Sequence, residues 1–248
     1  MDNTKYIALT NQMSLWNKLD MISNNIANMN TSGFKREEPV FSEYLSKSNN
    51  DTNESVNNTH FVQNLGTFRD FSEGAFVPTG NDLDVAIHGD AFFSIRTEEG
   101  ERYSKKGQFT INNENQITTN DGYILLSESN EPIAIDPNEK ELTITKDGAI
   151  FQGEQNIGKI KLVEFSDIKE LSKTHSGLYK TQSNNPARVA ENLSLEQGMI
   201  EKSNVNPIVE MTKMIEVQRA YERAQRVIEI EHQRQTDAIQ SLSQKATA

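Results

Sequence analysis

The chain has 248 residues, a formal net charge of −11 and a mean hydropathy of −0.67. Because it contains no cysteine, disulfides, cysteine-ligated metals and thiol nucleophiles are excluded. It has no apolar run long enough to cross a bilayer and no basic patch to neutralise nucleic-acid phosphates. We therefore expect no direct membrane insertion and no binding to DNA or RNA. The opening residues, MDNTKYIALTNQ, lack the apolar stretch of a cleaved secretory signal, so no such signal is expected.

The negative charge is concentrated in the middle of the chain. Residues 1–45 and 196–248 each carry a net charge of −1, which leaves −9 for residues 46–195. Terminal segments with nearly balanced charge are expected of surfaces that lie against other proteins. A strongly acidic middle segment repels like-charged copies and helps to keep the protein in solution.

The N-terminal segment is predicted to be a helix with two apolar stripes. The first stripe has the alternating spacing of four and three that is typical of a heptad seam: Leu15, Leu19, Ile22, Ile26 and Met29. The second lies partly around the helix: Tyr6, Leu9, Met13 and Trp16. A lone surface helix needs one apolar face, so two stripes predict contact with more than one neighbour.

An asparagine-rich stretch, SNNIANMNTSGFK, follows the first stripe. A phosphate loop is disfavoured because the stretch has one glycine and no preceding strand. The sequence Asn30-Thr31-Ser32 is formally a glycosylation sequon, which matters only on a eukaryotic secretory route. We interpret the stretch as a helix exit formed by Asn28, Thr31 and Gly33, because such residues compete with the helical backbone or adopt positive φ.

The middle of the chain is predicted to be rich in β structure. Residues 46–64 are polar and rich in Asn, Ser and Thr, as in a linker or mobile loop. Short apolar runs then alternate with turn dipeptides such as Asp121-Gly122 and Asp147-Gly148. The expected domains are an N-terminal helix with its exit (1–45), a polar linker (46–65), an antiparallel β domain (66–190) and a C-terminal helix (191–248).

The C-terminal helix has a clear predicted start. Asn206 is a favourable N-cap and Pro207 suits the first helical position. An apolar stripe follows: Met211, Met214, Val217, Tyr221, Ala224 and Ile228. Charged side chains at helical spacing predict ion pairs from Glu222 to Arg219 and Arg226 and from Glu231 to Arg234. The fold class is therefore α+β, with the two terminal helices paired as a coiled-coil-like domain and the β domain inserted between them.

No catalytic, cofactor or metal site is expected. The four histidines are scattered without metal-ligand spacing: His60, His88, His175 and His232. The acidic groups Asp82, Asp84 and Asp90 could suggest acid–base chemistry, but acidic residues at strand ends are the commoner explanation. The run NNENQITTNDG lacks the glycine and the terminal glutamate of a calcium loop.

Several motifs resemble the flagellar basal-body rod and hook family. The N-terminal signature is carried by Asn24, Asn25, Ala27, Asn28, Thr31, Gly33, Phe34 and Lys35. LDVAIHGDAFF is similar to the central family motif but has Ala91 where glycine is usual, so a turn that needs positive φ there would have to be built differently. EQGMIEKSNVNPIVEMTKMIEVQRAYE is similar to the C-terminal signature. Within the family, the length and the tail most resemble the proximal rod branch, with the distal rod branch as the alternative.

This resemblance implies a structural, non-enzymatic subunit that assembles through its terminal helices into a hollow tube and transmits torque. The implied partners are copies of itself, other rod proteins and the flagellar type III export apparatus. The implied location is the basal-body rod in the periplasmic space, reached by export without a cleaved signal.

We expect the assembly interface to lie on the helices and their signatures. Its candidate residues are Leu15, Trp16, Leu19, Ile22, Asn25, Ile26, Met29, Phe34, Met211, Met214, Ile215, Gln218, Arg219, Tyr221 and Ile228. Two alternatives remain open from the residues alone. The helices could fold onto the protein's own sheet, or the chain could be a soluble helical adaptor or chaperone.

Overall fold

The computed structural model describes residues 2–47, 58–137, 139, 141–181, 186–190 and 194–246. The chain has N- and C-terminal helices with a central antiparallel β-rich region, so the fold is α+β. It divides into two compact units. The helical unit comprises Met1–Ala27, Glu37–Phe68 and Asn206–Ala248, and the β unit comprises Asn28–Arg36 and Arg69–Val205.

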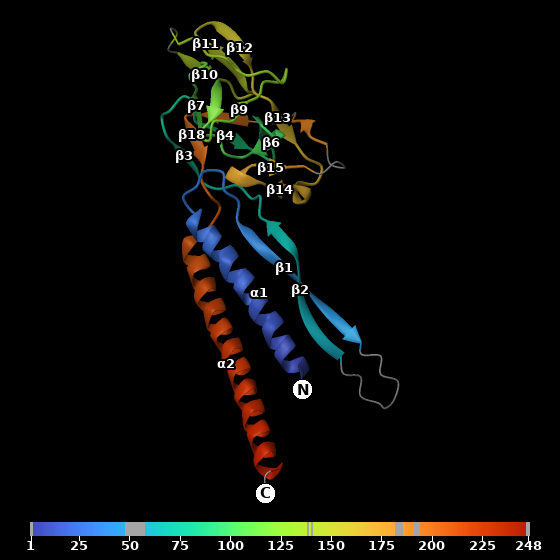
Figure 1. Ribbon diagram of the computed structural model, residues 1–248. Helices are drawn as coiled ribbons and strands as arrows, with labels where there is room; N and C mark the ends of the chain where they lie inside the picture. The colour runs from blue at the N-terminus through green and yellow to red at the C-terminus, as the bar shows by residue number, and fades with distance from the viewer. Residues whose placement is uncertain are drawn as a thin grey trace. The chain divides into compact units, whose positions relative to one another are not determined.

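The helical unit contains two helices and one strand pair. Its elements are α1 (Asp2–Ala27), α2 (Pro207–Ala246), β1 (Glu37–Lys47) and β2 (Asn58–Arg69). The helices α1 and α2 lie side by side, and the paired strands β1 and β2 run in opposite directions (Figure 1). The side chains of Trp16 on α1 and Tyr221 on α2 meet with 6.1 Å between their ring centroids.

The inward face of α2 repeats every seven residues. Glu210, Val217 and Ala224 are buried, and Met214 and Tyr221 lie half-buried between them. This spacing of four and three keeps one face of a long helix against its partner. After Pro207 the helix contains no further proline and no glycine, which accounts for its length of 40 residues.

One of the predicted ion pairs of α2 forms and two do not. Arg234 Nη2 lies 3.1 Å from Glu231 Oε2. Within the part of the chain that the structure describes, Glu222 makes no ion pair with Arg219 or Arg226. Solvent screens such exposed partners, so little free energy holds them together.

The structure draws two boundaries differently from the sequence expectation. Of residues 46–65, expected as a linker, 46–47 and 58–65 belong to β1 and β2, while 48–57 lie outside the described residues. Residues 194–201, expected with the C-terminal helix, are instead strands. These strands are only four and three residues long and pair with distant partners, so local periodicity does not reveal them.

The β unit is built from short antiparallel strands. They are β3 (Phe76–Pro78), β4 (Val85–His88), β5 (Phe92–Thr97), β6 (Gly100–Ser104), β7 (Phe109–Ile111), β8 (Ile117–Thr119), β9 (Ile124–Leu125), β10 (Leu142–Ile144), β11 (Ala149–Gln152), β12 (Gln155–Lys159), β13 (Leu162–Glu164), β14 (Ser172–Lys173), β15 (Tyr179–Lys180), β16 (Arg188–Val189), β17 (Ser194–Gln197) and β18 (Met199–Glu201), with 3₁₀ turns η1 (Ile168–Glu170) and η2 (His175–Gly177).

A nine-stranded sheet forms the centre of the β unit. Seven of its strands follow the order β14-β15-β6-β5-β9-β8-β7, and β13 joins β5 and β16. Strands β10, β11 and β12 form a separate sheet, β17 pairs with β4, and β18 pairs with β3. As predicted, Asp121-Gly122 connects β8 to β9, and Asp147-Gly148 connects β10 to β11.

Strand β5 separates two apolar cores. Side chains alternate across a strand, so Phe93 enters the larger core and Phe92 enters the smaller aromatic one. Phe93 meets Phe109 edge-to-face at 5.0 Å between centroids, and Phe92 meets Phe165 at 5.6 Å. The motif LDVAIHGDAFF, which contains Phe92 and Phe93, therefore contributes to both cores of the β unit.

The alanine at position 91 fits its turn without strain. The described non-glycine residues with positive φ are three others, and Ala91 is buried in the larger core. The positive φ of this turn falls on Gly89, at +94°. The glycine usual at position 91 is therefore not needed for the backbone here.

Candidate assembly surface

Asn25 holds three elements of the helical unit together. It is 1% exposed, and its Nδ2 donates to Glu37 O at 2.8 Å and to Glu210 Oε2 at 3.2 Å. Its Oδ1 accepts a hydrogen bond from the Glu37 N–H at 3.0 Å. The amide thus connects α1 to β1 and α2, and a buried amide satisfied on both ends is specific in its geometry.

Charged groups surround this junction. Lys213 Nζ on α2 lies 3.0 Å from Glu38 Oε1 and 3.5 Å from Glu210 Oε1. The lysine is half-buried, so its pairing is less screened than that of a fully exposed pair. The Asn25 junction therefore has an ionic rim.

A hollow of about 300 Å³ opens beside the Asn25 junction. Apolar side chains of α1, β1 and α2 line it together with charged ones: Lys18, Ile22, Glu37, Glu38, Pro39, Phe41, Glu210, Lys213, Glu216 and Val217. We call it the α1–β1–α2 groove.

The helix exit belongs to the β unit. The Thr31 N–H donates to Asn28 O at 3.1 Å, and the Gly33 N–H donates to Glu201 O at 2.8 Å. Gly33 has φ +66°, and a Cβ placed on it would lie 2.7 Å from Lys105 C. A side chain at position 33 would therefore clash with backbone that cannot move easily.

Lys35 and Glu201 form a buried ion pair that joins the two family signatures. Lys35 Nζ lies 2.6 Å from Glu201 Oε1 and donates to Ser72 O at 2.8 Å. Glu201 Oε1 also accepts the N–H of Gly74 at 2.8 Å. Such a pair fixes geometry more than it adds stability, because both charges lose their water.

Lys105 is a second buried lysine in this region. Burial, together with the positive charge of Lys35, lowers the pKa of Lys105 to about 8. Its Nζ donates to Gly89 O and lies 5.2 Å from the centre of the Phe92 ring. With Ser32, Phe34 and Lys35 also buried, the exit segment packs into the β unit.

The predicted interface residues divide into three groups by exposure. Ile22, Asn25 and Phe34 are buried within the chain, and Lys173 Nζ lies 4.6 Å from the centre of the Phe34 ring. A second group is half-buried: Leu15, Leu19, Ile26, Met29, Met214, Tyr221 and Ile228. The exposed group is Trp16, Met211, Ile215, Gln218 and Arg219.

The start of α2 has the geometry of a capped helix. Asn206 Oδ1 accepts from the N–H groups of Ile208 at 3.1 Å and Val209 at 3.3 Å, and Pro207 is the first helical residue. Several exposed apolar side chains of α2 were part of neither the predicted stripe nor the candidate interface: Ile208, Val209, Val227 and Ile230. A helical projection of all apolar positions on α2, rather than of one stripe, would have found them.

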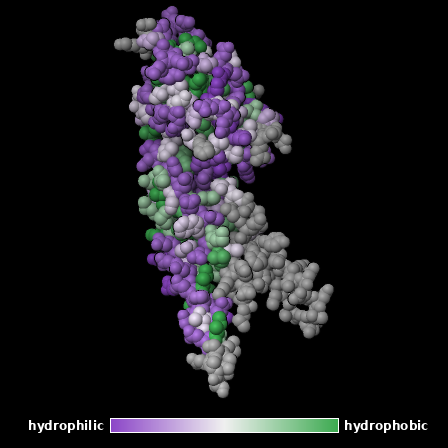
Figure 2. Space-filling view, viewed as in Figure 1, coloured by the Kyte–Doolittle hydropathy of each residue, from purple (hydrophilic) through white to green (hydrophobic). Residues whose placement is uncertain are grey.

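The outward faces of both helices carry apolar side chains. On α1, Leu9 and Met13 are 48% and 61% exposed, and Trp16, although one side of its ring meets Tyr221, is also 61% exposed. On α2, Ile208, Met211 and Ile215 share one face by their spacing of three and four. Figure 2 shows apolar patches interrupting the hydrophilic surface over these helices.

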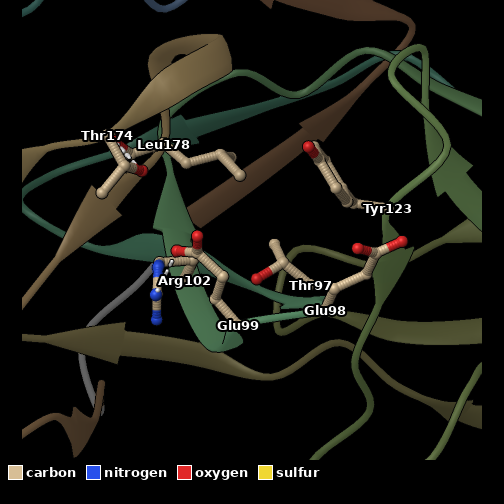
Figure 3. Close-up of a pocket in the computed structure, with 7 residues that line it drawn as sticks. All are labelled: Thr97, Glu98, Glu99, Arg102, Tyr123, Thr174 and Leu178. Atoms are coloured by element: carbon tan, nitrogen blue, oxygen red, sulfur yellow. Dashed lines mark hydrogen bonds and ion pairs between the residues drawn. The ribbon is translucent and has the colours of Figure 1, made fainter.

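A second hollow of about 300 Å³ lies in the β unit (Figure 3). Its polar lining includes Glu99 and Arg102, whose Oε2 and Nη2 atoms are 3.0 Å apart, and Arg102 Nη1 donates to Glu101 O. The guanidinium is thus already bonded to the protein. Within the described ranges, no three or more His, Cys, Asp or Glu side chains gather where a metal ion could bind. No described helix combines the length and apolarity that spanning a membrane requires.

Three family profiles match separate parts of the chain. They are described as flagella basal body rod protein (residues 6–35), flagellar hook protein FlgE/F/G D1 domain (86–152) and flagellar basal body rod FlgEFG protein C-terminal (196–241). A flagellar basal-body rod protein FlgF from Caulobacter vibrioides is 37% identical over 98% of this chain and 98% of its own. The chain belongs to the flagellar basal-body rod protein family.

Other members of this rod protein family are also similar. FlgF from Mesorhizobium japonicum is 31% identical over 99% of this chain and 100% of its own. FlgG from Buchnera aphidicola (subspecies Schizaphis graminum) is 34% identical over 82% of this chain and 86% of its own. The matches support the family resemblance of the sequence motifs, and the profile ranges contain both partners of the Lys35–Glu201 pair.

Proposed function

We propose that this chain is a structural subunit of the bacterial flagellar basal-body rod that assembles through its two terminal helices. The observation that carries this proposal is the uncovered apolar surface on the outward faces of α1 and α2. Apolar area left in water costs about 25 cal/mol per Å² relative to burial, so neighbouring copies gain free energy by covering it.

In this proposal α1 and α2 pair as a coiled coil. The inward face of α2 supports such packing, because buried and half-buried side chains alternate at spacings of four and three. The helical unit then serves as the assembly domain and the β unit as the inserted domain. Repeated contacts between different surfaces generate a ring or a helical tube, and a hollow tube can transmit torque.

We assign the subunit to the proximal rod, with the distal rod as the alternative. The FlgF proteins of Caulobacter and Mesorhizobium support this assignment, because they match 98–99% of the chain, whereas the FlgG proteins of Buchnera and Bacillus subtilis match 82–90%. The proposal includes periplasmic assembly with other rod proteins after export without a cleaved signal through the flagellar type III apparatus.

The test replaces Ile215 by aspartate in the full chain and measures motility of a strain that lacks the native subunit. Ile215 is 53% exposed in the isolated chain, so the variant should fold normally and fail to assemble. The matched control is Ile111→Asp, since Ile111 is an isoleucine of 47% exposure on β7 in the β unit.

The expected result is loss of motility for Ile215→Asp alone, with unchanged circular dichroism for both variants. Full motility with Ile215→Asp would contradict the proposal. Sedimentation separates the adaptor alternative, because an adaptor forms one small oligomer, whereas a rod subunit forms longer assemblies as its concentration rises.

A further inference from the structure

A cluster of unpaired arginines lies on the outward face of α2. Arg219, Arg223 and Arg226 are exposed, and none of them forms an ion pair within the described chain. Together with Glu222 and Val227 they line one surface hollow. Val227 is 46% exposed, so an apolar side chain sits among three positive charges. We call these five residues the arginine patch.

The α1–β1–α2 groove has the opposite net charge to the arginine patch, and its centre is also apolar. Its floor includes the buried side chains of Ile22 and Val217 and the half-buried ring of Phe41. Four carboxylates and two lysines surround this floor, which gives the lining a net negative charge. Among the carboxylates, Glu216 is exposed and has no ion-pair partner in the described chain.

The two surfaces match in charge and in apolar content. The arginine patch carries three positive charges and one negative charge, so its excess is equal in size and opposite in sign to that of the groove. Complementary charge of this kind steers association and fixes register, while the apolar centre contributes burial.

One copy cannot fill its own groove with its own patch. Both surfaces belong to α2, where Val217 faces inward and Arg219 and Arg226 face outward. Their centres on α2 are separated by about nine residues, or roughly 14 Å at about 1.5 Å per residue. A rigid helix cannot fold back over that distance, so the occupant must come from another molecule, and the opposite net charge of the two linings favours a second copy.

We propose that the arginine patch of one copy docks into the α1–β1–α2 groove of the next. This inference rests on the proposed function and names the contact through which copies associate. Because patch and groove are different surfaces, the contact is heterologous and leaves a free patch and a free groove at the two ends. With nearly parallel helices, each copy would be displaced along the axis by roughly 14 Å.

Charge exchange in the full chain tests the contact. Arg223→Glu makes the patch less positive, and Glu216→Arg makes the groove less negative. Each change alone should weaken self-association about tenfold in sedimentation experiments, and the double variant should recover most of it. Raising salt should weaken the wild-type association and the double variant alike.

Arg188→Glu in β16 is the matched control, because Arg188 is an exposed arginine of the β unit. It should leave association and motility unchanged. Circular dichroism and Trp16 fluorescence report whether each variant is folded, and motility of complemented strains gives a second measurement of assembly.

Failure of this contact can be told from failure of the proposed function. If Ile215→Asp abolishes assembly but Arg223→Glu and Glu216→Arg do not, the docking proposal is wrong and the rod proposal stands. If both charge variants weaken association and the double variant stays weak, the two residues do not face each other and the docking proposal is again wrong. If Ile215→Asp leaves assembly intact, the rod proposal itself is contradicted.

Discussion

Replacing Gly33 by alanine should destabilise the β unit more than the same change at Gly80. Both glycines have similar positive φ, +66° and +72°, so both substitutions carry the same backbone cost of about 1 kcal/mol. A Cβ at position 33 would lie 2.7 Å from backbone atoms of Lys105 and Lys106, whereas a Cβ at position 80 meets nothing within 4 Å. Relief of that clash should cost about 1–3 kcal/mol more.

The measurement is guanidinium unfolding followed by the near-ultraviolet circular dichroism of the tyrosines. Tyr103 and Tyr179 are buried in the aromatic core, so their signal reports on the β unit. We expect a loss of about 2–4 kcal/mol for Gly33→Ala and about 1 kcal/mol for Gly80→Ala. Equal losses for the two variants would refute the idea that the helix exit is docked tightly against the backbone.

Three further changes test the buried polar contacts. Lys35→Met should cost about 3–5 kcal/mol of unfolding free energy, and adding Glu201→Gln should recover part of it, because the uncompensated carboxylate is then removed; a double-mutant cycle measures this. Lys105 has a lowered pKa in the folded state, so above pH 8 the unfolded state binds more protons than the folded state does. The unfolding free energy should therefore rise by about 2 kcal/mol from pH 7.5 to 9.5. Lys105→Met should abolish that rise. Asn25→Ala should cost about 2–4 kcal/mol in the helical unit, followed by Trp16 fluorescence, and a loss below about 1 kcal/mol would contradict the three-element junction.

Features decided by neighbouring residues could be predicted from the sequence. The start of α2 at Pro207 depends on the side chain of Asn206 and the next three residues. Each predicted hairpin turn depends on one Asp-Gly pair. The α+β class follows from the same local patterns. Helix caps and tight turns are readable because their hydrogen bonds span few residues.

Features decided by distant partners could not be predicted. The short strands β17 and β18 are ordered by pairing with β4 and β3, more than 100 residues earlier. Likewise β1 and β2 were expected in part as a linker, because their composition near residues 46–64 gives no apolar alternation.

Asn25 shows why residue type alone is ambiguous. In the sequence it is one of several asparagines that indicate a helix end. In the structure its amide is fixed by Glu37 and Glu210, which lie 12 and 185 residues away along the chain. Nothing in the local pattern identifies the second partner, so the sequence could indicate a polar signature but not its purpose.

The long loop closed by the Lys35–Glu201 pair has a consequence for the order of folding. Its partners are 166 residues apart, and β17 and β18 also come late in the chain. Because the chain is synthesised from its N-terminus, the asparagine-rich signature has no docking site until about residue 201 has been made. Closure of so large a loop is slow, so we expect a partly synthesised chain to stay flexible, with this loop open, until the C-terminal signature has been made.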